Sequence, residues 1–164
     1  MDLKTEAVVA RDWDEVGELL DAAFAPSKFE STLMAGLRHA GREVRERAVR
    51  NGGRIIAHVA FTNAYRGTLP IGHHLAPVSV HSGCQRQGIG TFLLTQALAE
   101  PGIAERAVFV LGDPRYYGRF GFHRIARPRC PFDRHNQHFQ ALRWTANDDF
   151  AVGYEPEFQR AGRG

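Results

Sequence analysis

The chain has 164 residues, of which 43% are hydrophobic and 24% are charged, and its net charge is +3. This length and composition are typical of one compact domain with its own hydrophobic core. No apolar run approaches the length of a membrane span, and no signal peptide is recognisable. We therefore expect a cytoplasmic protein with a single domain over residues 1–164, a core from about residue 5 to residue 158, and a frayed C-terminal tail from residue 160.

The mild basic excess does not indicate a nucleic-acid-binding protein. The arginines are scattered along the chain, and the aromatic platform of RNA-binding modules is not seen. Attraction of a polyanionic ligand explains the sign of the charge equally well. We expect neither nucleic acid nor membrane as a partner.

The first third of the chain predicts a strand, two helices and a β-hairpin. Asp12 is placed to cap the first helix, and Pro26-Ser27 breaks it. Asn51-Gly52 predicts the turn of the hairpin. The expected ranges are 7–10 for the strand, 12–25 and 29–41 for the helices, and 43–49 with 54–62 for the hairpin strands.

The remaining residues predict further strands that alternate with helices. Apolar residues at helical spacing follow Gly88 and stop at Glu100-Pro101-Gly102. The expected strands are 75–80, 107–111, 139–144 and 150–154, and the expected helices are 89–99 and 114–120. The pattern predicts an α/β fold with a mixed central sheet and flanking helices.

The most informative segment is Gln85–Gly90, between the strand at 75–80 and the following helix. A strand that turns through glycines into a helix leaves backbone N–H groups unpaired, and the helix dipole adds partial positive charge. An anionic ligand such as a phosphate fits this point, with Arg86 free to contact it. An ordinary strand-to-helix turn remains the alternative. A Rossmann dehydrogenase is not favoured, because Leu93 occupies the position of the third glycine in the dinucleotide-binding fingerprint. A P-loop NTPase is not favoured, because the sequence contains no Walker motif.

The same segment resembles the acetyl-CoA-binding motif of the GCN5-related N-acetyltransferase (GNAT) family, Gln/Arg-x-x-Gly-x-Gly/Ala. Gln85, Gly88 and Gly90 fill its three defined positions. Residues 75–81 resemble the splayed, bulged strand that precedes this motif in the family. The match departs at Ser82-Gly83-Cys84, where family members more often have a proline and an aromatic or acidic residue.

A second family element lies downstream. Residues 111–122 resemble a family segment that ends in Tyr-x-Lys/Arg-x-Gly-Phe. The sequence pattern GDPxYYxRFGF is close to the pattern found in a bacterial subgroup of predicted acetyltransferases. Two motifs in the right order are more specific than either motif alone. The resemblance covers nearly the whole chain and implies the single-domain acyl-CoA N-acyltransferase (GNAT) fold.

The resemblance also implies an activity and its site residues. It implies direct transfer of an acetyl group from acetyl-CoA to a primary amine through a tetrahedral intermediate; the alternative is a catalytically silent acyl-CoA-binding sensor. The backbone N–H of Val78 would stabilise the oxyanion, and Tyr117 would protonate the leaving thiolate, with Tyr116 in its place if the alignment slips. The cofactor-binding residues would be Val78, Ser79, Val80, Gln85, Arg86, Gln87, Gly88, Ile89, Gly90 and Thr91.

The general base is not identified by the sequence. Glu30, His73, His74 and His81 are candidates, and a water chain is another. Cys84 lies near a helix N-terminus, where a thiolate is favoured, although direct transfer is the usual family route.

The sequence favours no metal. Cys130, His135 and His138 are close together, with Cys84 as a further candidate ligand, but their spacing matches no established zinc pattern.

The acceptor stays open as a small-molecule or peptide amine. Phe24, Phe29, Trp144 and Tyr154 can line an aromatic cleft, or they can pack in the core. The resemblance allows a homodimer.

Overall fold

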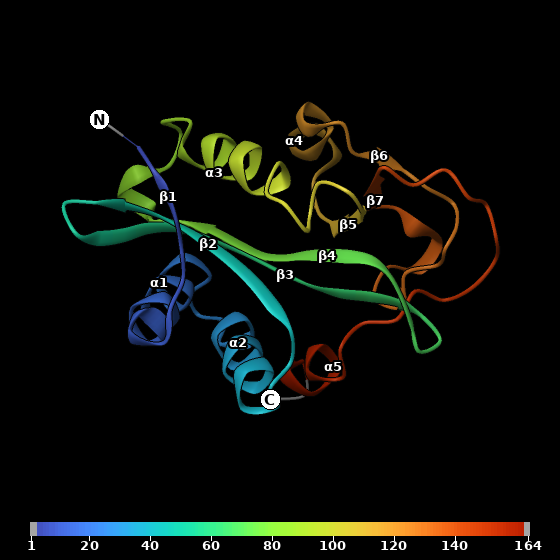
Figure 1. Cartoon of the computed structure of the whole chain (residues 1–164), viewed down its shortest axis with the longest axis horizontal. Helices are drawn as coiled ribbons and strands as arrows, with labels where there is room; N and C mark the ends of the chain where they lie inside the picture. Colours follow the sequence, from blue (N-terminus) through green and yellow to red (C-terminus); the bar gives the residue numbers. More distant parts are fainter. Residues whose placement is uncertain (1–2, 163–164) are drawn as a thin grey trace.

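The protein was analysed as a computed structural model that describes residues 3–162. One seven-stranded sheet runs through it in the order β1-β2-β3-β4-β5-β7-β6, and helices cover both of its faces (Figure 1). The parallel pair is β4 with β5, and the other neighbours are antiparallel. The strands are β1 (Thr5–Ala7), β2 (Val44–Asn51), β3 (Arg54–Arg66), β4 (Leu69–Val80), β5 (Ala107–Leu111), β6 (His123–Arg124) and β7 (Phe139–Leu142). The α-helices are α1 (Trp13–Ala23), α2 (Phe29–His39), α3 (Ile89–Leu98), α4 (Pro114–Tyr117) and α5 (Glu157–Ala161).

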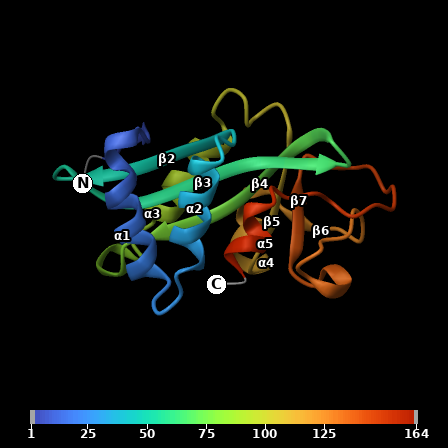
Figure 2. The same ribbon diagram turned by 90° about the horizontal axis from the view of Figure 1, so that it is seen from below.

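The helices form two layers that bury opposite faces of the sheet. Helices α1, α2 and α5 lie on one face, and α3 and α4 lie on the other (Figures 1 and 2). The first layer packs leucines such as Leu20, Leu33 and Leu37 against the sheet. The second layer packs Leu93 and Leu94 of α3 against β3, β4 and β5. The expected mixed α/β sheet with flanking helices is confirmed.

The first half of the chain follows the predicted order closely. The hairpin of β2 and β3 turns at Asn51–Arg54, and α2 ends before Gly41, whose φ is +69°. Strand β1 lies at 5–7 rather than 7–10. Strand β4 begins at Leu69, six residues earlier than expected, because Gly67 allows a second tight hairpin from β3.

The second half contains the errors in the predicted elements. Residues 150–154 form only isolated bridges, Tyr65 with Gly153 and Arg129 with Ala151, so the predicted last strand is wrong. The short strand β6 was not expected. Helix α5 includes residues 160 and 161 of the expected frayed tail, and residues 163 and 164 of that tail lie outside the described residues.

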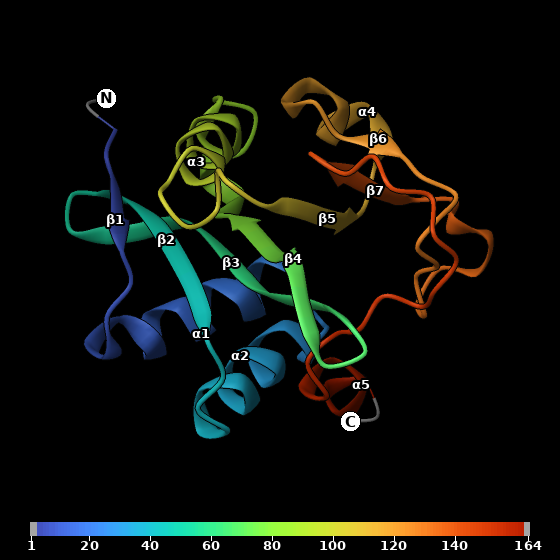
Figure 3. The ribbon, with the colours of Figure 1, turned by 45° about the vertical axis from the view of Figure 1, so that its right-hand side comes forward.

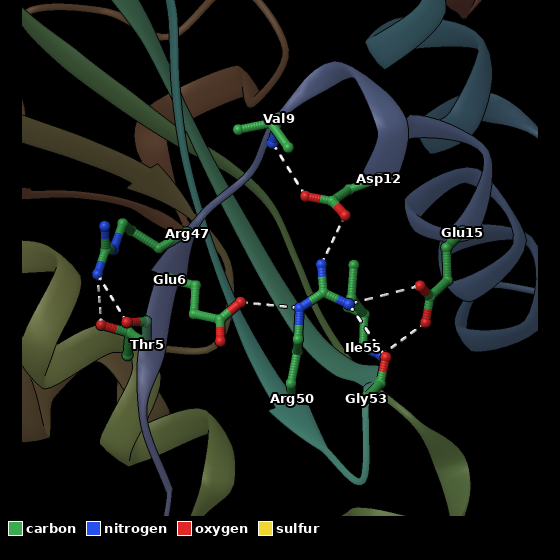
Figure 4. Close-up of polar contacts among 9 residues, drawn as sticks. All are labelled: Thr5, Glu6, Val9, Asp12, Glu15, Arg47, Arg50, Gly53 and Ile55. Atoms are coloured by element: carbon green, nitrogen blue, oxygen red, sulfur yellow. Dashed lines mark hydrogen bonds and ion pairs between the residues drawn. The ribbon is translucent and has the colours of Figure 1, made fainter.

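Arg50 joins the N-terminal segment to the β2–β3 hairpin (Figure 4). Its guanidinium donates to Glu6 Oε2 at 2.8 Å, to Asp12 Oδ1 at 2.5 Å and to the Gly53 carbonyl at 3.1 Å. Asp12 does not cap α1 with its side chain as predicted; its other oxygen accepts the Val9 N–H at 3.0 Å. That bond, together with Arg50, lowers the pKa of Asp12. The network holds α1 in its place on the sheet.

Over the described residues, none of the helices is long and apolar enough to span a membrane.

Candidate functional site

Strands β4 and β5 separate after a short paired stretch. They pair only from Gly72 with Ala107 to His74 with Phe109. A Cβ at residue 72 would clash with the Ala107 carbonyl oxygen, so the close start of this pair requires glycine. Beyond His74, β4 runs on toward α3, whereas β5 continues beside β7 toward α4 (Figure 3). The result is an open gap in the middle of the sheet.

A β-bulge bends β4 at the start of this gap. In the register with β3, Val59 faces Val78 and Phe61 faces Leu75, so Ala76-Pro77 together oppose one residue of β3. An extra residue bends a strand and increases its local twist. The bulge expected from the family resemblance is therefore present.

The backbone of Val78 and Val80 faces the gap. The His81 N–H donates to the Ile56 carbonyl of β3 at 2.7 Å. Because backbone groups alternate sides along a strand, Ser79 also faces β3, and Val78 and Val80 face the other way. Their pairing with β5 has already ended at His74. The N–H and C=O of Val78 and the N–H of Val80 are thus available to an extended ligand, whereas the Val80 carbonyl accepts from Gln85 Nε2.

The loop after β4 leads into an uncapped helix N-terminus. Gly88 is the N-cap of α3 with φ +78°, and no side chain of the described residues caps the first turn. Arg86 also has a positive φ of +65° and is exposed. The first N–H groups of α3 are therefore unpaired where the loop enters the helix. The positive end of the helix dipole lies at the same point. The geometry of the predicted anion site is present.

The side chains of Gln85 and Gln87 hold the loop together from within. Gln85 Nε2 donates to the Val80 carbonyl at 3.2 Å, and Gln87 Nε2 approaches the Gly83 carbonyl at 3.5 Å. In this structure both amides therefore act on the loop itself.

Two predicted cofactor-binding residues have buried side chains. Ile89 is 1% exposed and packs in the core beneath α3. Ser79 is 5% exposed, and its hydroxyl has no partner among the described residues. The Ser79 backbone also pairs with β3, so of these two residues only Ile89, through its backbone N–H, is available to a ligand. The cofactor-binding role of both stays a prediction.

Tyr116 and Arg119 extend the loop site, and the sequence reasoning did not assign either to binding. A Cβ at Gly90 would lie 2.9 Å from the Tyr116 hydroxyl and 3.3 Å from Val80 Cγ2. The Arg119 guanidinium lies 4.6 Å from the centre of the Tyr116 ring, and its Nη1 is 3.5 Å from Thr91 Oγ1. A cation thus stands beside the first turn of α3. The signal was present in the sequence, because Arg119 is the basic residue of the Tyr-x-Lys/Arg-x-Gly-Phe motif.

Tyr117 lies beside the end of β5, on the other side of the gap. Its ring packs on Gly112, where a Cβ would lie 2.5 Å from Tyr117 Cε2, and edge-on to Phe122 at 5.8 Å. The side chain is 8% exposed, and this burial raises the pKa of Tyr117 to about 12. Its hydroxyl is therefore fully protonated at neutral pH. Its catalytic role stays a prediction.

A cavity of about 640 Å³ opens on the α2 and α5 side of the same gap. Leu75 and Ala76 of β4 and Val110 and Leu111 of β5, the residues just past the last paired position, form its floor. Its walls are mainly aromatic. The ring-bearing residues that line it are Phe29, His74, Phe109, Phe132, Tyr154 and Phe158.

The aromatic cleft suggested by the sequence is half right. Phe29 and Tyr154 line the cavity. Phe24 instead packs against the core between α1 and α2, and Trp144 lies edge-on to Phe109 at 5.4 Å.

His74 borders this cavity and is kept neutral. It is 1% exposed, its ring stacks on Tyr154 at 3.6 Å, and its Nε2 donates to the Gly153 carbonyl at 3.0 Å. Burial lowers the pKa of His74 to about 3. The other candidate bases do not line the cavity: His73 bonds the Gly102 carbonyl, His81 contacts Arg54, and Glu30 accepts from Ser27.

The candidate metal ligands do not converge. Cys84 packs beside the α3 core, whereas Cys130 lies in a separate cluster with its Sγ 3.5 Å from the Tyr154 hydroxyl. Within residues 3–162, no group of three or more potential metal ligands is found.

The buried His74 predicts a loss of stability in mild acid. The unfolded chain protonates this imidazole near pH 6.5, whereas the folded chain keeps it neutral to about pH 3. The unfolded state therefore binds more protons below pH 6.5, and the free energy of unfolding falls by up to about 1.4 kcal/mol per pH unit from this group. Urea unfolding at pH 7, 6 and 5 measures the slope. His74→Gln, which keeps an N–H donor, should flatten it, with His39→Gln at an exposed site of α2 as control; an equal slope in all three proteins contradicts the assignment.

Comparisons with known proteins agree with this geometry. Residues 44–124 match the model of the acetyltransferase (GNAT) domain. An uncharacterized N-acetyltransferase of Escherichia coli K12, YjhQ, is 32% identical over 117 residues, which are 68% of this chain and 64% of the relative. The match thus spans slightly less than two thirds of that relative.

Two solved structures are similar over nearly the whole chain. The GNAT family N-acetyltransferase YhbS of Escherichia coli, in complex with CoA, has a TM-score of 0.87 and 27% identity, covering 96% of this chain and 92% of its own. A GNAT family acetyltransferase of Brucella melitensis, in complex with acetyl-CoA, has a TM-score of 0.79 and 27% identity, covering 96% and 98%. The splayed strands, the glycine loop before α3 and these similarities lead to one conclusion: the chain belongs to the GNAT family of acetyltransferases.

Proposed function

We propose that the protein is an N-acetyltransferase that moves the acetyl group of acetyl-CoA directly to a primary amine. One observation carries the proposal: the edge of β4 at Val78 and Val80, which is not paired with β5, is followed by the uncapped N-terminus of α3. CoA has groups that match these two features in the same order, because its extended arm with amides is followed by a pyrophosphate. Single-domain organisation over residues 1–164 is part of this proposal.

The residues present fit such a ligand. The outward N–H and C=O of Val78 and the N–H of Val80 can pair with amides of the pantetheine arm, as an added strand does. The N–H groups at Gly88–Thr91, with Arg86 and Arg119 beside them, suit the pyrophosphate. The similar proteins of Escherichia coli and Brucella melitensis bind CoA and acetyl-CoA.

The chain's own groups supply the remaining chemistry. Acetyl-CoA, when bound, supplies an activated acyl group as a thioester. The Val78 N–H, which faces away from β3 beside the bulge, would donate to the carbonyl oxygen as it gains charge. Tyr117 holds a proton at its hydroxyl, because its pKa is raised to about 12, and can donate it to the departing thiolate.

Calorimetry with CoA and a transfer assay with acetyl-CoA over a panel of amines test the proposal together. CoA binding with acetyl transfer to any amine of the panel supports the enzyme. CoA binding without transfer to any amine favours the alternative, an acyl-CoA sensor. Absence of CoA binding overturns both.

A further inference from the structure

The residues that line the aromatic cavity favour one class of amine over another. It lies at the β4–β5 gap on the face opposite α3, so an amine inside it would reach a thioester held along β4 from the other side. Its volume of about 640 Å³ is in the range of sites that enclose a small organic molecule. Within residues 3–162, no Asp or Glu lines it.

Four carboxylates are adjacent in sequence to residues that line the cavity, and each is bonded elsewhere. Glu30 accepts from Ser27 Oγ at 3.0 Å, and Asp133 accepts the His138 N–H at 2.6 Å. Glu155, 5% exposed, accepts a hydrogen bond from the Tyr65 hydroxyl at 3.1 Å. Glu157, 4% exposed, accepts from Arg42 Nε at 2.8 Å. Neither lines the cavity, although the residues on either side of them, Tyr154 and Phe158, do. A cationic ammonium would find no counter-charge there.

The rings do not replace a counter-charge. One face of Tyr154 is covered by His74, and one face of Phe109 is stacked on Phe139 at 5.6 Å. A desolvated cation–π contact contributes about 2 kcal/mol or somewhat more, whereas taking an unpaired ion out of water costs several. His74 donates from Nε2 to the Gly153 carbonyl and packs against Tyr154, Phe109 and Phe158. Because burial lowers its pKa to about 3, it is too weak a base to deprotonate an ammonium.

We propose that this cavity takes a weakly basic aromatic primary amine, which enters uncharged and is held by its ring between the aromatic walls. The inference rests on the proposed acetyl transfer. Such an amine needs no general base before attack, in keeping with the absence of an acidic residue from the described lining. The N–C bond forms as the C–S bond breaks; nitrogen loses one proton to water, and the thiolate takes one from Tyr117, which water restores, so an amide and a free thiol result.

Two isomeric amines test the charge requirement. 4-Ethylaniline and 2-phenylethylamine have the same atoms and similar apolar surface, but only the second is a cation at pH 7. We expect kcat/KM at pH 7 to be at least about tenfold higher for 4-ethylaniline, and the value for 2-phenylethylamine to rise about tenfold per pH unit as its neutral fraction grows. Preference for 2-phenylethylamine at pH 7 overturns the inference and leaves acetyl transfer standing.

A single added charge should weaken the preference. Gln159 lines the cavity and is exposed, so Gln159→Glu places a carboxylate there with little risk to folding. With 2-phenylethylamine as the acceptor, we expect this variant to show a KM about two- to fivefold lower, as for one ion pair at an exposed site. Gln96→Glu, at an exposed site of α3 on the other layer, is the matched control. An equal response in both variants contradicts the placement of the amine.

Binding without acetyl-CoA separates this inference from the proposed function. Tyrosine and tryptophan fluorescence of the free protein should change on titration with 4-ethylaniline, and Phe132→Ala should weaken that binding. Phe132 is 47% exposed and lies edge-on to Tyr154 at 4.8 Å, so its removal opens the wall without emptying the core. Saturable binding that Phe132→Ala weakens supports the cavity assignment even if CoA does not bind; CoA binding without any binding of 4-ethylaniline overturns the assignment alone.

Discussion

Tyr117→Phe lowers kcat by about 100-fold and leaves the Kd of CoA within about twofold, as expected for loss of a general acid. The buried hydroxyl, with its pKa raised to about 12, holds a proton that phenylalanine lacks. The ring remains, so its packing on Gly112 and Phe122 is kept and the fold is not disturbed. Steady-state kinetics with the best amine of the panel, together with calorimetry for CoA, separate the two effects. Full turnover by Tyr117→Phe while chemistry limits the rate contradicts the role.

Gly112→Ala should also lower kcat, although it leaves the Tyr117 side chain chemically unchanged. The added Cβ would lie 2.5 Å from Tyr117 Cε2, so the ring must move from its position beside β5. We expect a fall in kcat of about tenfold or more, since general acid catalysis depends on hydrogen-bond reach. Gly118→Ala is the matched control, because nothing lies within 4 Å of its Cβ and its φ is −56°. A loss in Gly118→Ala equal to that in Gly112→Ala would point to general damage to α4.

Gly88→Ala raises the Kd of CoA by at least about tenfold, or about 1.4 kcal/mol. Gly88 is the N-cap of α3 with φ +78°, so alanine strains the turn and adds a methyl group where backbone must approach the pyrophosphate. No protein atom lies within 4 Å of the added Cβ, so the fold itself meets no clash. Calorimetry with CoA gives the affinity, and thermal unfolding gives the stability.

Gly41→Ala is the control for backbone strain. Gly41 follows α2 with φ +69° and also has open space around its Cβ. Both variants should lose similar stability, of about 1 kcal/mol, from the positive φ. Only Gly88→Ala should lose CoA affinity. Equal affinities in the two variants would show that Gly88 does not contact the ligand.

The segment from β4 to α3 could be predicted from the sequence because its signals are local. Val78, Val80 and Gly88 each lie at a strand or helix end that their neighbours in the sequence define. The first half of β4 was missed because Pro70, Gly72 and two histidines have a weak preference for strands. Pairing of this segment with β3 on one side and β5 on the other outweighs that weak preference.

The aromatic cavity could not be predicted in the same way. Phe29, Phe109 and Tyr154 come from α2, β5 and the segment before α5, and only the fold brings them together. Sequence spacing gives no sign that Phe24 and Trp144 pack elsewhere. The neutrality of His74 is likewise a product of burial against Tyr154 and Phe158, which is a tertiary effect.

The most direct test of the account is a backbone amide NMR titration of the full chain with CoA. The account predicts saturable shifts of the Val78 and Val80 amides and of the amides at Gln85–Thr91. The amide of Gly41 and the amides of α1, α2 and α5, on the opposite face of the sheet, should not shift. Shifts confined to another part of the sheet, or no saturable shift at Gly88–Thr91, would contradict the placement of acetyl-CoA along β4 and at the N-terminus of α3.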